Sequence, residues 1–132
     1  MAAGLLFDAS VFIPAEVGRP LQRRRPEGQA RVSVVTLAGL RLGVLRSEGR
    51  VRELREATLA AARRFEPMPV DEHVADELAA LLAKLRASQR RAKAFDCFVA
   101  ATALAHDLTV VAQDTDYQEL QAAQPRLSVA LV

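Results

Sequence analysis

Short apolar runs alternate with longer stretches of helical periodicity along this chain of 132 residues. The runs that predict β-strands are residues 5–7, 30–35, 108–112 and 127–132. Parallel strands must be joined by crossover segments, and a helix between two successive strands supplies one. The alternation therefore predicts an α/β fold in which helices cover both faces of a mostly parallel sheet.

The segments between these strands carry helix signals of different strength. We expect a short helix or turn at residues 11–17 and helices at residues 36–45, 52–64, 93–106 and 117–123. A further helix begins after Asp71 and has an apolar face made of Val74, Leu78, Leu81, Leu82 and Leu85. Residues 65–70 contain two prolines, so this link is expected to be extended.

A chain of this length is expected to form one domain over residues 1–132. Such a domain buries roughly two-thirds of its unfolded surface, which is enough for a core without disulfides. Aromatic residues make up only 5% of the chain, and Trp is absent. This composition disfavours a binding face built from many aromatic rings stacked on bases, as in many readers of single-stranded RNA.

The single cysteine, Cys97, cannot form an internal disulfide, which favours a reducing compartment. It lies in an apolar helical stretch, so we interpret it as a buried structural thiol rather than a nucleophile. The chain has no run of 18 or more apolar residues, so no membrane span is predicted. Residues 1–4 lack the basic region of a signal peptide. A cytoplasmic location is therefore expected.

Four aspartates from three separate regions lie at the ends of predicted buried elements. Asp8 and Asp114 each follow a strand directly, and the carboxyl ends of parallel strands form one edge of a sheet. Asp96 lies near the start of a helix among apolar neighbours, where a buried charge needs a partner. Asp116 is two residues beyond Asp114. Clustered carboxylates repel one another unless a cation such as Mg²⁺ lies among them, and such sites most often hydrolyse phosphodiesters.

Each of these acids also has a structural interpretation. Asp8 could cap the first helix, although Ser10 could do so instead. Asp114 could form an Asx turn. Asp116 and Glu119 have the spacing of a capping box for the last helix.

Two groups of basic residues leave two interpretations open. Arg23, Arg24 and Arg25 form one group, and Arg90, Arg91 and Lys93 form the other. Each could be a solvated face, or it could contact phosphate near the acidic site. The two histidines, His73 and His106, are interpreted as structural or solvent-exposed. The formal net charge of +2 does not by itself require a nucleic-acid partner.

Five stretches, taken together and in this order, resemble the PIN-domain ribonucleases, and among them the VapC-type toxins of bacterial toxin–antitoxin pairs. The stretches are residues 7–11 (FDASV), 32–38 (VSVVTLA), 41–44 (RLGV), 96–105 (DCFVAATALA) and 110–117 (VVAQDTDY). They run through almost the whole chain.

This resemblance implies a PIN-like α/β/α fold and a metal-dependent endoribonuclease that uses Mg²⁺ or Mn²⁺. It implies that Asp8, Asp96 and Asp114 are metal ligands, that Asp116 completes the acidic group, and that Ser10 holds a water or substrate. It also implies a homodimer, silenced by a VapB-type antitoxin. The antitoxin binds promoter DNA, so this chain would contact DNA only indirectly.

One position departs from the family pattern. The family normally has Glu where this chain has Gly39, inside a predicted helix in which Gly costs about 1 kcal/mol relative to Ala. The change could have been introduced to disarm a toxic nuclease, or this member could be naturally weakened. Glu16 gives no sign of replacing the lost carboxylate. The alternative function is a binding module that holds antitoxin or RNA without cleaving it. A phosphotransfer domain is disfavoured because Ser10 stands where that chemistry needs a second Asp.

Overall fold

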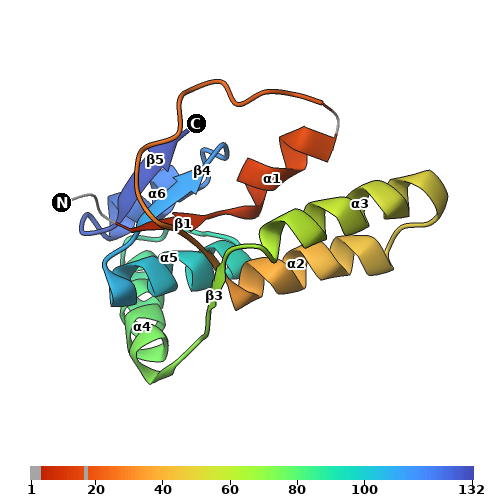
Figure 1. Ribbon diagram of the computed structural model, residues 1–132. Coiled ribbons are helices and arrows are strands. Elements are labelled where there is room, and N and C mark those ends of the chain that lie inside the picture. The colour runs from red at the N-terminus through yellow and green to blue at the C-terminus, as the bar shows by residue number, and fades with distance from the viewer. Residues whose placement is uncertain (1–3, 17) are drawn as a thin grey trace.

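The computed structural model describes residues 4–16 and 18–132, with the side chains of residues 15 and 16 left out. Its strands are β1 (Leu5–Phe7), β2 (Ala30–Ser33), β3 (Glu66–Met68), β4 (Thr109–Ala112) and β5 (Ser128–Leu131). Its helices are α1 (Ala9–Glu16), α2 (Val34–Leu45), α3 (Gly49–Ala62), α4 (Glu72–Ala87), α5 (Ala94–His106) and α6 (Tyr117–Ala123). Val17, the predicted end of the first helix, and residues 1–3 lie outside this description. Figure 1 shows the arrangement.

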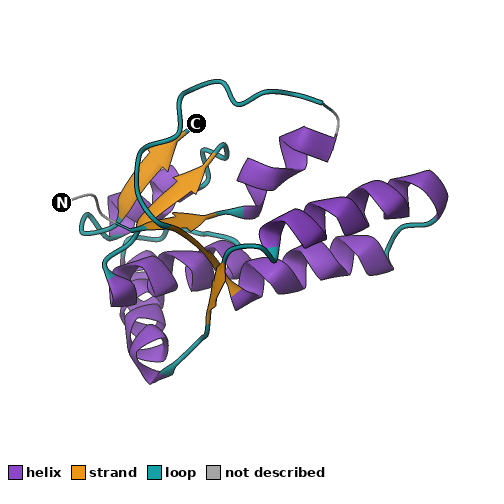
Figure 2. Ribbon diagram, in the orientation of Figure 1, coloured by secondary structure: helices purple, strands orange, loops and turns teal. Residues whose placement is uncertain are grey.

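The five strands form one parallel sheet in the order β3-β2-β1-β4-β5. β1 lies in the middle, where Leu5 is in register with Ala30 of β2 and with Thr109 of β4. Helices separate the strands in sequence and lie on both sides of them (Figure 2). The predicted α/β/α fold with a parallel sheet is confirmed.

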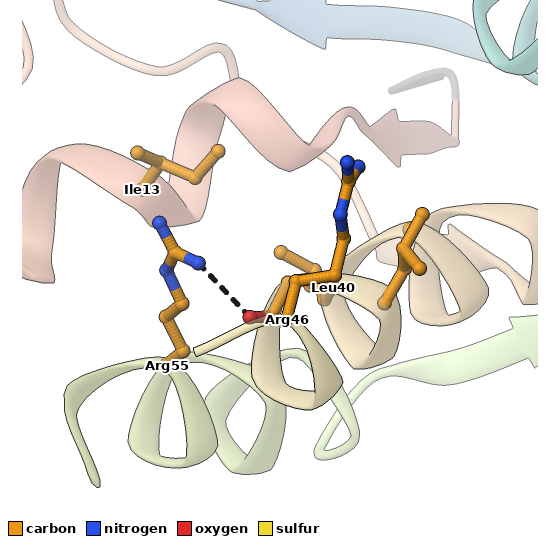
Figure 3. Close-up of a pocket in the computed structure, with 7 residues that line it drawn as sticks. Ile13, Leu40, Arg46 and Arg55 are labelled. Atoms are coloured by element: carbon orange, nitrogen blue, oxygen red, sulfur yellow. Dashed lines mark hydrogen bonds between the residues drawn. The ribbon is translucent and has the colours of Figure 1, made fainter. Parts of the chain in front are cut away.

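Helices α2 and α3 form an antiparallel pair that extends away from the sheet (Figure 1). One guanidinium nitrogen of Arg55, Nη1, donates a hydrogen bond of 2.9 Å to the carbonyl oxygen of Gly43 (Figure 3). This contact joins the middle of α3 to the last turns of α2. Gly39, in the second turn of α2, thus belongs to a helix pair that this hydrogen bond holds together.

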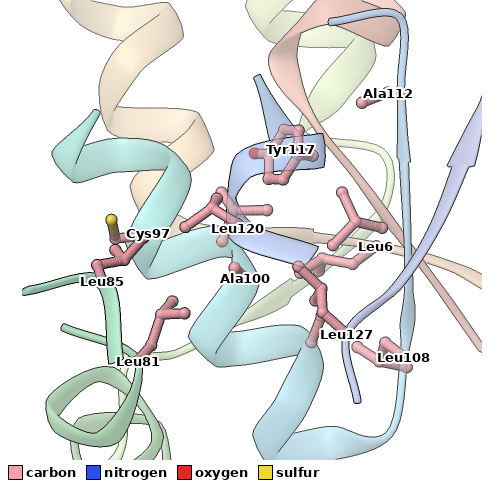
Figure 4. Packing of buried hydrophobic residues seen from close by; sticks show 13 residues of the cluster. Leu6, Leu81, Leu85, Cys97, Ala100, Leu108, Ala112, Tyr117, Leu120 and Leu127 are labelled. Atoms are coloured by element: carbon pink, nitrogen blue, oxygen red, sulfur yellow. The ribbon is translucent and has the colours of Figure 1, made fainter. Parts of the chain in front are cut away.

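Two apolar cores lie on the two faces of the sheet. Side chains alternate along a strand, so Leu6 points to one face while Leu5 and Phe7 point to the other. Leu6 packs with Val110 and with residues of α4, α5 and α6, including the buried Cys97 (Figure 4). Leu5 and Phe7 pack with residues of α1, α2 and α3. The predicted burial of Cys97 is confirmed, and burial followed by the nearby Asp96 charge raises the pKa of its thiol.

Two boundaries differ from the sequence prediction. The strand predicted at residues 30–35 ends at Ser33, because the Ser33 hydroxyl accepts a hydrogen bond of 3.0 Å from the Val35 N–H. Ser33 is thus the N-cap, and α2 begins at Val34 rather than at Thr36. Helix α3 begins at Gly49, three residues before the predicted start.

The extended link predicted at residues 65–70 joins the sheet as its edge strand, β3. Pro67 is tolerated there because an edge strand can leave one side unpaired. The cap predicted for the next helix is confirmed, since Asp71 accepts a hydrogen bond of 2.8 Å from the Val74 N–H. No helix within the described residues is long and apolar enough to cross a membrane.

Candidate active site

The carboxyl edge of the sheet carries the predicted acids. Asp8 comes directly after β1, and its N–H donates a hydrogen bond of 2.9 Å to the Val111 carbonyl of the neighbouring β4. Asp114 comes two residues after β4. Helix α5 ends close to the start of β4, so its first turn, with Asp96, lies toward the opposite end of that strand. Three segments far apart in the sequence therefore meet at one edge.

Asp8 has a fully specified orientation. Its Oδ2 atom accepts a hydrogen bond of 3.0 Å from the Ser10 N–H at the start of α1. Its Oδ1 atom accepts a hydrogen bond of 2.7 Å from the Tyr117 hydroxyl. Only 8% of Asp8 is exposed. The helix cap is thus confirmed for Asp8 rather than for Ser10. The cap uses only one carboxylate oxygen, so Asp8 still belongs to the acidic edge.

Tyr117 is a site residue that sequence reasoning missed. Its ring is fully buried among the apolar residues of one core (Figure 4), and the Asp8 carboxylate that its hydroxyl contacts is 109 positions away. Burial, followed by the Asp8 charge, raises the pKa of its hydroxyl, so Tyr117 stays protonated and donates its hydrogen bond to Asp8. The available signal was the chain's single Tyr directly after Asp116, because a buried phenol needs a hydrogen-bond partner.

Ser10 links the first helix to the loop after β4. Its hydroxyl oxygen accepts a hydrogen bond of 2.9 Å from the Gln113 N–H. This contact fixes the loop that carries Asp114 relative to α1. The predicted role of Ser10 toward water or substrate remains a prediction.

Asp96 has the most perturbed carboxyl group of the site. It is half-buried in the first turn of α5, and its Oδ2 atom is buried without a hydrogen-bond partner among the described residues. Its pKa rises from 3.8 to about 6 because burial penalises the charged form and because Asp8, Asp114 and Asp116 repel it. Like-charge repulsion of this kind requires proximity, so the four acids share one electrostatic environment.

The two aspartates after β4 make different local contacts. Asp114 Oδ1 accepts a hydrogen bond of 2.9 Å from the Asp116 N–H, which is the predicted Asx turn. The predicted capping box is wrong, because the Asp116 side chain makes no capping hydrogen bond in the described chain. Its Oδ2 atom lies 3.0 Å from Lys93 Nζ instead. The ion pair with Lys93 holds Asp116 toward the N-terminus of α5.

The acids do not close into a preformed cage. Within residues 4–16 and 18–132, no three Asp, Glu, His or Cys side chains are arranged to hold a metal ion. Gly39 has no side-chain oxygen, and a Cβ atom built on it would lie 3.1 Å from Phe95 Cδ2 and 3.2 Å from Cε2. The space next to Gly39 is thus occupied by the ring of Phe95, the residue before Asp96.

A cavity of about 540 Å³ adjoins Gly39 on the α2 side. It lies between α1, α2 and α3, and it combines apolar side chains with two guanidinium groups (Figure 3). The lining residues are Ile13, Gly39, Leu40, Leu42, Gly43, Arg46 and Arg55. Sequence reasoning did not single out Arg46 or Arg55, since neither belongs to a run of basic residues.

The predicted basic groups are partly engaged in contacts. The Arg25 guanidinium lies 5.0 Å from the centroid of the Phe7 ring. Arg90 pairs with Glu119 of α6 at 2.7 Å, as Lys93 pairs with Asp116. Nearby carboxylates, Asp116 above all, raise the pKa of Lys93. These pairs tie the N-terminus of α5 to α6 beside the acids.

The two histidines lie away from the acids. His106, in the last turn of α5, has its Nε2 atom 3.3 Å from Asp71 Oδ2. The His73 ring, at the start of α4, lies 6.2 Å from the His106 ring. These contacts join α4 to α5 and agree with the predicted structural role.

Comparisons with known proteins place the chain in a family. The PIN domain family model matches residues 5–123. Ribonuclease VapC4 of Mycobacterium tuberculosis is 42% identical over 128 residues, which cover 96% of this chain and 95% of the relative. Ribonuclease VapC5 of the same organism is 41% identical, covering 92% of this chain and 90% of the relative.

The fold has a solved counterpart. The crystal structure of the toxin–antitoxin complex VapBC-5 from Mycobacterium tuberculosis contains a chain that superimposes with a TM-score of 0.87. The two chains are 34% identical, and the match covers 98% of this chain and 99% of the other. The chain therefore belongs to the PIN-domain family, among the ribonucleases of the VapC type.

Proposed function

We propose that this chain is a metal-dependent endoribonuclease toxin of a toxin–antitoxin pair. The observation that carries the proposal is the Asp96 carboxyl group, which has a buried oxygen without a partner among the described residues and a pKa raised by three neighbouring acids. A buried charge in this state favours binding of a cation. The likeness to VapC4 and VapC5, both named ribonucleases, supports RNA as the substrate.

The donor set fits a hard divalent cation, since every candidate ligand is a carboxylate oxygen. Asp8, Asp96 and Asp114 would hold Mg²⁺ or Mn²⁺, and Asp116 would complete the acidic group. Such an ion, when bound, polarises the scissile phosphate and makes a water more acidic. Gly39 has no side-chain oxygen, so the present chain would hold the ion with fewer carboxylates than a chain with Glu at this position.

The chain's own residues prepare the site in distinct ways. Tyr117 and the Ser10 N–H each hold one oxygen of Asp8, so this carboxylate keeps one orientation. Asp96 is mostly ionised at neutral pH, because its raised pKa of about 6 still lies below 7. Lys93 holds Asp116 and places a positive charge beside the acids, where it can contact an RNA phosphate.

The partners follow from the same likeness. We propose a VapB-type antitoxin as the inhibitor of this chain, because the matched structure is a VapBC toxin–antitoxin complex. The chain would act in the cytoplasm, where RNA is accessible. It would pair with a second copy and contact promoter DNA only through the antitoxin.

A second candidate is a binding module that holds RNA or antitoxin without cleavage. Gly39 favours this alternative, because a carboxylate is missing where the family normally has Glu. The two candidates differ in what the Gly39→Glu substitution does: it restores cleavage to an impaired nuclease and only adds a charge to a binding module.

The test is cleavage of a panel of single-stranded RNAs, with Mg²⁺ or Mn²⁺, by the present chain and by the Gly39→Glu variant. We expect slow cleavage or none from the present chain and metal-dependent products from the variant. Adding Asp96→Asn to the Gly39→Glu variant should abolish those products. A Gly39→Glu variant that is folded but inert on every RNA, or one whose products persist after Asp96→Asn is added, would contradict the enzyme proposal.

A further inference from the structure

Among the Phe and Tyr side chains, all of which lie in the described residues, Phe95 is the exposed one. It lies in the first turn of α5, immediately before Asp96, and 46% of its surface is exposed. The other rings are engaged elsewhere: Phe7, Phe12 and Phe65 pack against one another, Tyr117 is buried, and Phe98 is partly buried. The chain thus places one accessible ring at the edge of the acidic site.

The glycine at position 39 allows this placement. The Cδ2–Cε2 edge of the ring lies so close to α2 that a Cβ atom at Gly39 would come within 3.1 Å of it. The contact covers one edge of the ring and leaves much of its surface accessible. The ring therefore lies against α2 at Gly39, on the residue directly before Asp96 and two residues after Lys93, which pairs with Asp116.

We propose that Phe95 positions the substrate by stacking on a nucleobase of single-stranded RNA next to the scissile phosphate. This inference rests on the proposed ribonuclease function. An unstacked base presents an apolar face of about the size of a phenyl ring, and its phosphates are attracted to cations such as Lys93. An exposed ring beside Asp96 and Lys93 matches that combination of a flat base and a charged backbone.

The low aromatic content fits a single contact of this kind. With one accessible ring, the protein can fix one base near the cleavage site but cannot hold a row of stacked bases. Stacking tolerates any base, because every base has a π-face. Phe95 should accordingly strengthen binding to single strands of many sequences.

The test uses two single-stranded RNA probes, an oligoadenylate and an abasic oligomer of the same length. Binding is measured in EDTA at low salt, so that no cleavage occurs. Phe95→Ala should weaken oligoadenylate binding about 5- to 150-fold and leave abasic binding unchanged. Phe95→Leu should lose most of the affinity as well, because it keeps apolar bulk without an aromatic face. Val51→Ala, which alters a residue of α3 that is 50% exposed, is the matched control and should change neither.

A second readout reports stacking directly. The chain contains no Trp, so Phe95→Trp introduces a single indole at this position. This variant should bind oligoadenylate at least as tightly as the unmodified chain, and its fluorescence should be quenched by oligoadenylate but not by the abasic oligomer. The Leu and Trp variants keep the test valid if Phe95→Ala proves unstable.

Three results would overturn the inference, and they have different meanings. Equal loss of affinity for both probes, or no loss for either, would show that Phe95 does not stack on a base although the chain binds RNA. Unchanged RNA affinity with an altered oligomeric state would assign the ring to a protein interface. No binding of any RNA by the unmodified chain, together with no cleavage by Gly39→Glu, would overturn the proposed function itself.

Discussion

The Asp96 carboxyl group weakens the metal-free protein at neutral pH. Its pKa in the folded state, about 6, exceeds its ordinary value of 3.8, so the folded state binds this proton more tightly than the unfolded state does. The stabilisation from that proton is complete below pH 3.8 and is lost as the pH rises through 6. Above pH 6 the ionised group is half-buried among three other acids.

We therefore expect Asp96→Asn to stabilise the metal-free protein above pH 6 by about 1 kcal/mol, after allowance for solvent screening. The gain should disappear as the pH falls toward 3.8. Urea unfolding in EDTA across this pH range measures both effects. A variant that is less stable than the unmodified chain at every pH would show that the Asp96 carboxylate has a favourable partner in the folded protein.

The Tyr117 hydroxyl should contribute to stability through Asp8. Tyr117→Phe keeps the buried ring and removes the 2.7 Å hydrogen bond to a carboxylate, which typically stabilises by about 1.5–3 kcal/mol. We expect a loss of that size in urea unfolding. A double-mutant cycle with Asp8→Asn isolates the pair. If the two losses simply add, the hydroxyl does not act through Asp8.

Residues of this site differ in how far sequence could predict them. Asp8 and Asp114 could be placed at one edge because each follows an apolar strand, and parallel strands end together. Tyr117 could not be assigned to Asp8, because that contact depends on how α6 packs against the central strand. The capping box at Asp116 failed because its backbone is helical rather than extended and its N–H is already donated to Asp114, both of which depend on the turn after β4.

At the scale of elements, helix α2 contains two glycines in different surroundings. A Cβ atom at Gly43 would lie 3.7 Å from Arg55 Cδ, an ordinary contact, whereas one at Gly39 would press on the Phe95 ring. Gly43→Ala should raise the free energy of unfolding by about 0.5–1 kcal/mol, because Ala is the better helix residue. Gly39→Ala should raise the free energy of unfolding by less, because displacing the Phe95 ring offsets part of that gain.

The two alanine variants are compared by urea unfolding at the same pH. Adding Phe95→Leu to Gly39→Ala should restore the missing part of the gain, because a smaller, flexible side chain can give way. Equal gains from Gly39→Ala and Gly43→Ala would mean that the ring moves without cost. The start of α2 was misplaced from sequence because the β-branched residues Val34 and Val35 favour a strand, while the Ser33 cap begins a helix there.

At the scale of the whole molecule, the parallel sheet could be predicted because alternating strands and helices permit few topologies. The strand order, with β1 central, follows from which crossovers lie on each face, and short apolar runs do not encode that choice. The edge strand β3 was missed as a strand because Pro67 and an exposed Glu66 give it little strand signal. The acidic edge depends on the central pair β1 and β4, which the sequence predicts well.

This architecture predicts that a divalent cation stabilises the fold against heat. The acids come from the ends of β1 and β4 and from the start of α5, so an ion held among them joins segments that unfolding separates. An ion at about 100 times its Kd adds about 2.7 kcal/mol to the free energy of unfolding. We expect Mg²⁺ or Mn²⁺ to raise the midpoint of thermal unfolding relative to EDTA, and Gly39→Glu to enlarge the rise.

Two aspartate variants separate this effect from general screening of charge. Asp96→Asn should lose most of the rise, because it removes an acid from the edge. Asp107→Asn is the matched control: it removes one acid at the far end of α5, at a left-handed position (φ 57°) that Asn tolerates. That variant should keep the full rise. If the ion raises the unfolding midpoint equally in both variants, it acts by screening the overall charge of the protein. An ion bound at the acidic edge would depend on Asp96, whereas general screening would not.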